Sequence, residues 1–124
     1  MRFHGIYQHD VRDCGVACLA TICEYYGLKA PLSYIRDLEK VNMNGSSIYG
    51  ICEAAKILGL DAEAYQGSIR ELLEEVNDTK EICTPFIVHT VRDGLFHFVV
   101  IKKINSHFVW LFDPDKGNSK MKIE

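Results

Sequence analysis

Residues 8–19 read QHDVRDCGVACL and mark the start of the helix around which the N-terminal half is expected to fold. Asp13 is of a residue type that caps helix N-termini, and the apolar run after it predicts a helix starting at Cys14. A helix start stabilises an anion, so the pattern predicts a Cys14 thiol whose pKa lies below its ordinary value. The charge of Asp13 opposes a thiolate there. Cys14 therefore needs a cationic partner, for which His97 is the candidate.

The composition is that of an ordinary globular protein, with 124 residues, 48% of them hydrophobic and 25% charged, so we expect a single domain over residues 1–124. A net charge of -3 without a basic cluster argues against nucleic-acid binding. No stretch approaches the roughly 18 apolar residues of a membrane helix, and the N-terminus lacks the apolar core of a signal peptide. We therefore expect a cytoplasmic chain. Its five cysteines, an odd number, predict reduced thiols without a structural disulfide.

Apolar spacing and capping residues predict a helical first half. The first helix carries one charge, Glu24, and is expected to run through the middle of the domain. The expected helices cover residues 14–26, ended by Gly27, residues 31–39, starting at Pro31, residues 48–58, capped by Ser46 or Ser47, and a fourth segment from Ile69 to Val76, capped by Ser68. A short strand is expected between the last two, at Asp61–Tyr65.

The second half has the composition of β-strands, because it is rich in Val, Ile, Phe and Trp. Asp93-Gly94 and Asn105-Ser106 are turn signals between these runs. The expected strands cover residues 84–91, 95–104 and 107–112, with a last edge strand at 116–124. Helices first and strands second predict an α+β fold in which an antiparallel sheet packs on helices.

The expected hairpin after Leu95 brings two chemically important residues together. A three-residue loop centred on Asn105 would place His97 directly opposite Asp113, with Cβ atoms about 4.5 to 5.5 Å apart. The carboxylate would then orient the imidazole and stabilise its cationic form, as in a catalytic triad. This placement depends on the register of the two strands, because a two-residue loop would instead place Pro114 opposite His97.

These residues also resemble the motifs of a known family, the bacteriocin-processing cysteine peptidases found as papain-like domains at the N-terminus of peptidase-containing ABC transporters. The resemblance extends over most of the chain and keeps the family's order. It rests on Gln8 with Cys14 six positions later, the run Asp13–Leu19, the run His97-Phe98-Val99-Val100, and Asp113-Pro114.

The resemblance implies a role for each of these residues. Cys14 would be the nucleophile, His97 the general base and later the acid, Asp113 the residue that orients His97, and Gln8 a donor of the oxyanion hole. It also implies the substrate, the leader peptide of a bacteriocin, lantibiotic or similar secreted peptide, cut after a Gly-Gly or Gly-Ala pair. Transmembrane and nucleotide-binding domains would accompany the peptidase at the cytosolic face of the bacterial membrane, and no cofactor is implied.

Three alternatives stay open. The chain can be a module that binds a leader peptide without cutting it, although the presence of Cys14 argues against this. It can be another papain-like Cys-His-Asp enzyme, such as an acyltransferase or amidase. A zinc site formed by Cys14, Cys18 and His9 is the weakest, because no second ligand pair follows at a typical spacing. We therefore expect no metal.

Overall fold

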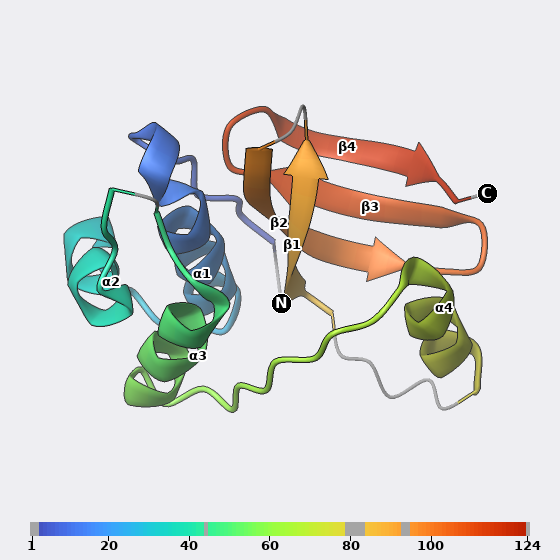
Figure 1. Ribbon diagram of the computed structural model, residues 1–124, viewed down its shortest axis with the longest axis horizontal. Coiled ribbons are helices and arrows are strands. Elements are labelled where there is room, and N and C mark those ends of the chain that lie inside the picture. The colour runs from blue at the N-terminus through green and yellow to red at the C-terminus, as the bar shows by residue number, and fades with distance from the viewer. Residues whose placement is uncertain (1–2, 44, 79–83, 93–94, 124) are drawn as a thin grey trace.

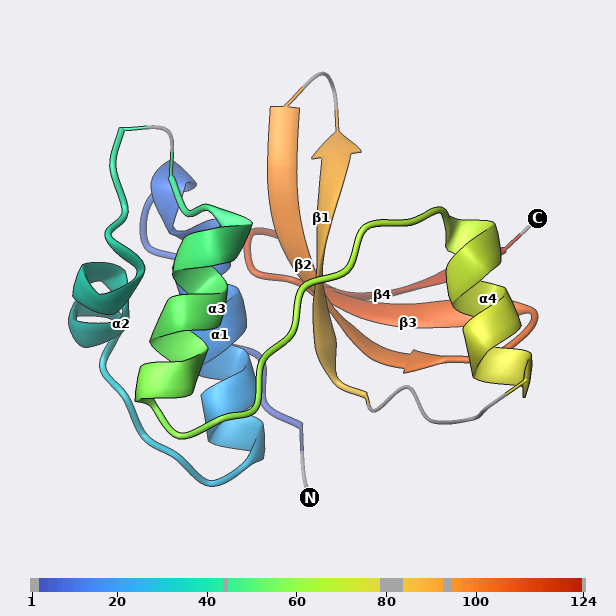
Figure 2. The same ribbon diagram turned by 60° about the horizontal axis from the view of Figure 1, so that its bottom comes forward.

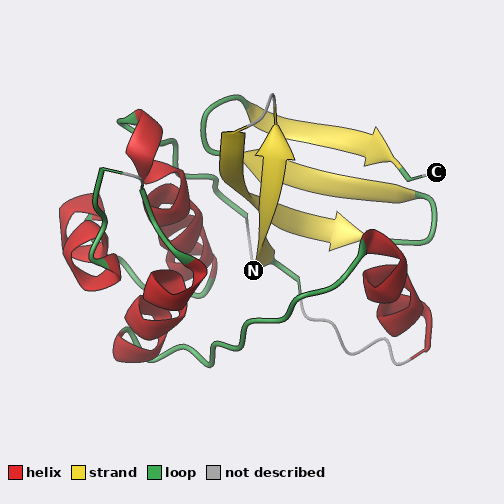
Figure 3. Ribbon diagram, viewed as in Figure 1, coloured by secondary structure: helices red, strands yellow, loops and turns green. Residues whose placement is uncertain are grey.

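The computed structural model describes residues 3–43, 45–78, 84–92 and 95–123. Helices come first and strands second (Figure 3), which confirms the predicted α+β fold. The helices are the short 3₁₀-helix η1 (Val11–Asp13), α1 (Cys14–Tyr25), α2 (Leu32–Glu39), α3 (Ile48–Ile57) and α4 (Ile69–Asp78). The strands are β1 (Phe86–Arg92), β2 (Leu95–Ile104), β3 (Phe108–Asp113) and β4 (Gly117–Lys122).

Helix α1 forms the centre of the helical part, as its apolar sequence predicts. Its first ten residues, 14–23, are all buried. The helix lies between α2 and the sheet, with α3 alongside it (Figure 1). Leu19 packs in one core cluster with Ile35 of α2, and Cys18 packs in another with Phe98 of β2. The helix that begins at Cys14 is therefore held from both sides.

The four strands form one antiparallel sheet in the order β1-β2-β3-β4. Phe98, Val100 and Phe112 pack in the same cluster as the first turns of α1. Val109 and Leu111 belong to a second cluster formed by residues of the sheet. Figure 2 shows α4 on the opposite side of the sheet from α1, α2 and α3. The sheet therefore separates the helical layer from the last helix.

The register between β2 and β3 differs from the predicted one. Val100 pairs with Phe112, and Ile104 pairs with Val109, with an irregularity between Ile101 and Lys103. The extra residue is a β-bulge, which adds one residue to one strand only. Continuing the pairing from Val100 places Asp113 opposite Val99, so the prediction that it lies directly opposite His97 is wrong.

The contact between His97 and Asp113 nevertheless forms. His97 lies two residues before Val99 and shares its face of the strand, which makes Asp113 its diagonal neighbour. Diagonal neighbours on one face remain within reach of long side chains. His97 Nε2 lies 2.8 Å from Asp113 Oδ1. The predicted contact is thus confirmed, although it arises through a different register.

The predicted strand at Asp61–Tyr65 is wrong. Residues 60–68 have no strand pairing and connect α3 to α4, a path that Figures 1 and 2 both show. Asp61, Glu63 and Tyr65 alternate with smaller residues as strand residues do, but all three are exposed. Because this segment has no neighbouring strand to pair with, the alternation does not produce a strand.

Two of the predicted helix caps and one predicted turn are confirmed. Ser47 Oγ accepts a hydrogen bond from the backbone N–H of Gly50 at the start of α3. Ser68 Oγ accepts one from Glu71 N at the start of α4. Asn105 Oδ1 accepts hydrogen bonds from the N–H groups of His107 and Phe108, which closes the turn between β2 and β3. The turn predicted at residues 93–94 and the thiol at position 83 lie outside the described residues.

Candidate active site

The Cys14 side chain packs against β2 at the first residue of α1 and is only 8% exposed. Burial raises the pKa of the Cys14 thiol above its ordinary value, although hydrogen bonds from the backbone N–H groups of Phe98, Gly15 and Cys14 itself lower it. The nearby charge of Asp113 raises it further. The prediction that this pKa lies below its ordinary value is therefore wrong, because desolvation outweighs the lowering by the backbone donors of the helix start.

Asp13 does not cap α1, which corrects a second prediction. Its side chain makes no capping hydrogen bond and is 2% exposed. Both carboxylate oxygens instead accept hydrogen bonds from Arg36 of α2, with Nε to Oδ1 at 3.0 Å and Nη2 to Oδ2 at 2.6 Å. The negative charge beside Cys14 is thus paired with a guanidinium that the sequence pattern did not reveal.

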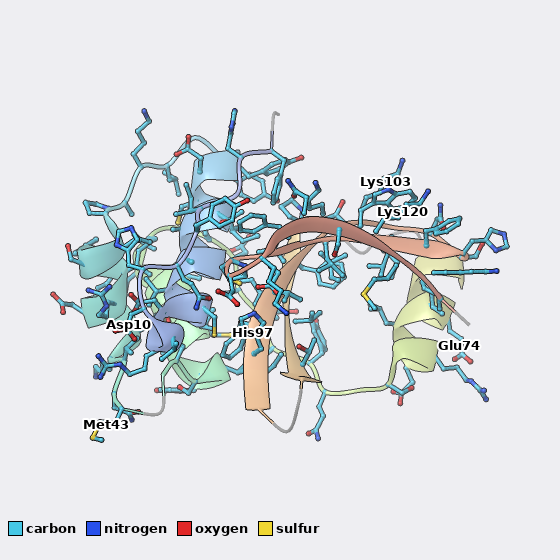
Figure 4. The ribbon with its side chains drawn as sticks, turned by 90° about the horizontal axis from the view of Figure 1, so that it is seen from above. Asp10, Met43, Glu74, His97, Lys103 and Lys120 are labelled. Carbon is cyan, nitrogen blue, oxygen red and sulfur yellow. The ribbon has the colours of Figure 1, made fainter. Side chains whose placement is uncertain are left out.

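The imidazole of His97 is held by Asp113. Because a carboxylate only accepts hydrogen bonds, the 2.8 Å contact assigns the proton to Nε2 and leaves Nδ1 as the basic nitrogen. Asp113 Oδ1 also accepts from the backbone N–H of Asp115 at 2.8 Å. Figure 4 shows His97 where the strands meet the helical part. The ring therefore has a fixed partner and a defined tautomer.

Cys14, His97 and Asp113 lie in one neighbourhood. The N–H that bonds to the Cys14 sulfur belongs to Phe98, the residue after His97. The charge of Asp113 is close enough to act on the Cys14 thiol. Thr90 Oγ1 donates to the carbonyl of His97 at 3.2 Å and fixes this part of β2 against β1. A thiol beside an oriented imidazole is the arrangement that nucleophilic catalysis uses.

Gln8 lies beside the same end of β3. Its backbone N–H donates to the carbonyl of Pro114 at 2.9 Å, directly after Asp113. Its Oε1 is buried without a hydrogen-bond partner among the described residues. The segment before η1 is also fixed to α1, because the N–H of Ile6 donates to Thr21 Oγ1 at 2.9 Å. The structure therefore brings all four predicted site residues to the junction of α1 and the sheet.

Sequence reasoning missed a buried carboxyl group near Asp13. Glu39, the last residue of α2, is 2% exposed and accepts a hydrogen bond from Ser46 Oγ. Its Oε2 is buried and has no hydrogen-bond partner among the described residues. Burial raises the pKa of Glu39 to about 7, against the Ser46 hydrogen bond and with help from the charge of Asp13. No signal in the sequence distinguishes it from an ordinary glutamate on a solvated helix face.

A surface groove of about 550 Å³ runs along α3. It lies between α3 and the connection that follows it. Its lining combines Ile48, Tyr49, Cys52, Ala62, Ala64 and Tyr65 with the charged residues Glu53, Lys56 and Glu63. Tyr49 is 75% exposed and Tyr65 is 84% exposed. Ile51, one helical turn after Ile48, packs in the same core cluster as Cys14. The helix that lines the groove therefore also packs against the candidate site, although Cys14 is not one of the lining residues.

Within the described residues, no group of three His, Cys, Asp or Glu side chains is arranged to hold a metal ion. Cys14, Cys18, Cys23 and Cys52 are free thiols. None of the described helices has the length and apolar character needed to span a bilayer.

Sequence comparison identifies one matching family and relatives that are processing and transport proteins. The Peptidase C39 family matches residues 2–124. The Lactococcin-G-processing and transport ATP-binding protein LagD of Lactococcus lactis is 34% identical over 119 residues, which are 95% of this chain and 16% of LagD. The pediocin PA-1 transport/processing protein PedD of Pediococcus acidilactici is 32% identical over 125 residues and is covered to 17%. The chain thus spans about a sixth of the length of these relatives.

Comparison of structures agrees. The peptidase domain of Streptococcus ComA, described as a bifunctional ABC transporter of a quorum-sensing pathway, superimposes with a TM-score of 0.84 at 31% identity, covering 98% of this chain and 87% of that domain. A double glycine motif protease from an AMS/PCAT transporter, solved in complex with the leader peptide, gives a TM-score of 0.81 at 29% identity, covering 98% and 80%. With the thiol, imidazole and carboxylate together at the junction of α1 and the sheet, this chain belongs to the Peptidase C39 family of cysteine peptidases.

Proposed function

We propose that this chain cleaves the leader peptide from a secreted peptide after a Gly-Gly or Gly-Ala pair, as a cysteine endopeptidase with Cys14, His97, Asp113 and Gln8 at its active site. The observation that carries the proposal is the 2.8 Å contact between His97 Nε2 and Asp113 Oδ1, made beside the strand residue whose N–H bonds to the Cys14 sulfur. The names of the relatives support the substrate, since they process bacteriocins and one was solved with a leader peptide.

In this mechanism the thiolate forms by proton transfer from Cys14 to His97. The N–H groups at the helix start lower the thiol pKa by less than burial raises it. We therefore assign the proton of the Cys14 sulfur to Nδ1 of His97, and Asp113 stabilises the resulting imidazolium. The sulfur then attacks the peptide carbonyl carbon. The oxyanion that forms accepts hydrogen bonds from the Gln8 side-chain amide and the Cys14 backbone N–H.

The second half of the reaction regenerates the enzyme. The C–N bond breaks as His97 returns its proton to the leaving amine, and a thioester joins the leader to Cys14. His97 then removes a proton from water, whose oxygen attacks the thioester carbonyl. The leader leaves with a free carboxylate, and the sulfur recovers its proton from His97.

The low exposure of Cys14 supports a preference for glycine in the substrate next to the cut. A nucleophile with 8% exposure admits a peptide only through a narrow approach, and glycine is the residue with the smallest side chain. We assign the apolar groove along α3 to the hydrophobic face of the leader, upstream of the cut, because helical peptides bind through such a face.

We also propose a setting for the domain. The relatives are transport ATP-binding proteins several times longer than this chain, which supports a peptidase domain over residues 1–124 that works beside transmembrane and nucleotide-binding domains. The peptidase would then act at the cytosolic face of the bacterial membrane, where leader removal accompanies export.

The test uses synthetic leader peptides that differ only in the two residues before the cut. Wild-type protein is expected to cut the Gly-Gly and Gly-Ala peptides and to leave an Ala-Ala peptide intact. Cys14→Ala is expected to bind the peptide with unchanged affinity and to lose at least about a thousandfold in kcat. Binding without cutting by the wild type would instead identify a leader-binding module. Transfer of the acyl group to an amine rather than to water would identify an acyltransferase.

A further inference from the structure

The carboxylate next to Cys14 has a dedicated partner on another helix. Asp13 and Arg36 lie 23 positions apart in sequence, yet the guanidinium donates to both oxygens of the carboxylate. A two-point contact of this kind fixes orientation as well as charge. The hydrogen bond to Asp13 is also the main reason that the pKa of Arg36 is raised, so the guanidinium remains charged at every working pH.

The pair acts on the one turn that carries the nucleophile. Asp13 is the last residue of η1 and immediately precedes Cys14, and its side chain does not cap α1. The orientation of this turn therefore depends on a contact from outside the helix. Arg36 provides it from α2, which Figures 1 and 2 place on the side of α1 away from the sheet. Arg36 thus acts on this turn from the side of α1 that faces away from the sheet.

Several acidic side chains surround the Asp13–Arg36 pair. Asp10 and Asp37 also lie near Arg36, and the buried carboxyl of Glu39 lies near Asp13. On the sheet side, Asp113 acts on Cys14. Without Arg36, Asp13 would be a buried negative charge beside a group that must itself become negative. Like charges at short range oppose ionisation.

We propose that Arg36 is a positioning residue for peptide cleavage, which fixes the turn before Cys14 through its two bonds to Asp13 and neutralises the carboxylate next to the nucleophile. This inference rests on the proposed function in one respect, namely that Cys14 is the nucleophile. Arg36 itself touches neither the reacting atoms nor the groove along α3, so its effect is on kcat and on ionisation of the thiol.

The experiment compares Arg36→Ala and Arg36→Lys with a matched control, Arg12→Ala. Arg12 is also close to Cys14 in sequence, but it pairs with Asp10 at the surface and not with Asp13. Two properties are measured: kcat and KM for a Gly-Gly leader peptide, and the pH dependence of iodoacetamide alkylation of Cys14, followed by mass spectrometry. The second readout needs no substrate.

Arg36→Ala is expected to lower kcat by about tenfold or more, with KM changed less than twofold, and to move the alkylation of Cys14 to higher pH. Arg36→Lys keeps the charge but loses one of the two bonds, so it is expected to fall between the wild type and Arg36→Ala. Arg12→Ala is expected to match the wild type in both readouts.

The double variant Asp13→Asn/Arg36→Ala keeps the proposal testable if Arg36→Ala does not fold, because it leaves no buried charge unpaired. It is expected to restore the alkylation profile while kcat remains low. Wild-type kcat in Arg36→Ala, or in the double variant when the single one does not fold, would overturn the proposal, and so would a wild-type alkylation profile in Arg36→Ala. A wild type that cuts no leader peptide would overturn the proposed function instead, and the alkylation series would still test Arg36.

Discussion

One carboxylate oxygen of Asp113 serves both the turn and the candidate site. Oδ1 accepts from His97 Nε2, from Asp115 N at 2.8 Å and, at 3.4 Å, from Lys116 N. The backbone contacts fix the carboxylate at the end of β3, and the fixed carboxylate in turn orients the imidazole. One carboxylate therefore both closes the turn after β3 and holds the imidazole of His97.

Asp113→Asn separates these two tasks. An asparagine oxygen can still accept from Asp115 N, so the fold and the affinity for the leader are expected to persist. The neutral amide no longer stabilises the imidazolium, so kcat is expected to fall by about a hundredfold, and the basic limb of the pH–rate profile is expected to move to lower pH. The loss should remain smaller than that of Cys14→Ala.

Asp115→Asn serves as the control for Asp113→Asn, because Asp115 is exposed and next to it in sequence. It is expected to keep the wild-type rate and pH profile. Wild-type kinetics in Asp113→Asn would show that this carboxylate only shapes the turn.

The buried Glu39 makes stability depend on pH. Its pKa rises from an ordinary 4.5 to about 7 in the folded chain, so folding favours the protonated form. Below about pH 4.5 Glu39 is protonated in both the folded and the unfolded chain, so the free energy of unfolding keeps its full value. As the pH rises to about 7 only the unfolded state ionises, and the free energy of unfolding falls by about 3 kcal/mol in total.

Glu39→Gln, a neutral isostere, is expected to remove this loss. The variant should unfold at higher urea than the wild type at pH 8, and the difference should disappear near pH 4. Urea titrations at both pH values measure it, with Asp61→Asn as an exposed control. An equal difference between Glu39→Gln and the wild type at the two pH values would contradict the assignment.

At the scale of elements, α1 is positioned by close packing of Gly15 against Ser46 and Ile51. A Cβ at this position would lie 2.5 Å from both Cβ and Oγ of Ser46, and 3.2 Å from Cδ1 of Ile51. Ser46 is itself bonded to Glu39 at the end of α2. The start of α3 therefore contacts the first turn of α1 directly, next to Cys14, and only glycine leaves enough space.

Gly15→Ala tests this contact. Overpacking costs about 1–3 kcal/mol, which exceeds or offsets the roughly 1 kcal/mol that alanine gains in a helix. We expect a Tm lowered by several degrees and a reduced kcat, because the turn that carries Cys14 must move. Combining it with Ser46→Gly removes both clashing atoms and should recover part of the Tm. A Gly15→Ala protein more stable than the wild type would rule out the close contact.

The bulge in β2 is a second feature at the scale of elements. It lets Ile101 pair with Leu111 while Lys103 pairs with Trp110. Lys103 and Lys120 then lie over the ring of Trp110, at 5.1 and 5.2 Å from its centroid, and Figure 4 shows both lysines together on the sheet, well away from His97. The bulge thus places apolar side chains in the core and charged ones at the surface.

At the scale of the whole molecule, the candidate site lies where the helical layer meets the sheet, and the groove runs along α3 of the helical layer. Cys14 comes from one layer, whereas His97 and Asp113 come from the other. Tyr65 comes from the connection that leaves the helical layer toward α4. A leader bound in the groove would therefore contact the helical layer while both layers act on its C-terminal end.

Tyr65→Ala is expected to raise KM for a full-length leader about fivefold or more with kcat nearly unchanged, because a large exposed aromatic side chain contributes binding area away from the reacting bond. A peptide shortened to the residues just before the cut should be hydrolysed equally by Tyr65→Ala and the wild type. Kinetics with both peptides measure the difference.

Tyr34→Ala is the matched control, since Tyr34 is also exposed but lies on α2, which the groove does not include. It is expected to leave KM unchanged. An equal rise in KM in both tyrosine variants would show that the groove along α3 does not bind the leader.

Much of the fold was predictable because local patterns suffice for it. The apolar run after Cys14, the serine caps and the strand-forming second half predict the helices and strands to within about two residues. The segment at Asp61–Tyr65 shows the limit of this reasoning, since alternation produces a strand only where another strand lies alongside.

The sequence by itself determined the elements, their order and the types of residue at the site, because each depends on neighbours in the chain. Only the tertiary structure decided the pairing of Asp13 with Arg36, the burial that raises the pKa values of Cys14 and Glu39, and the bulge by which Asp113 reaches His97 diagonally. These depend on contacts between distant segments and on the exclusion of water, which no local spacing encodes.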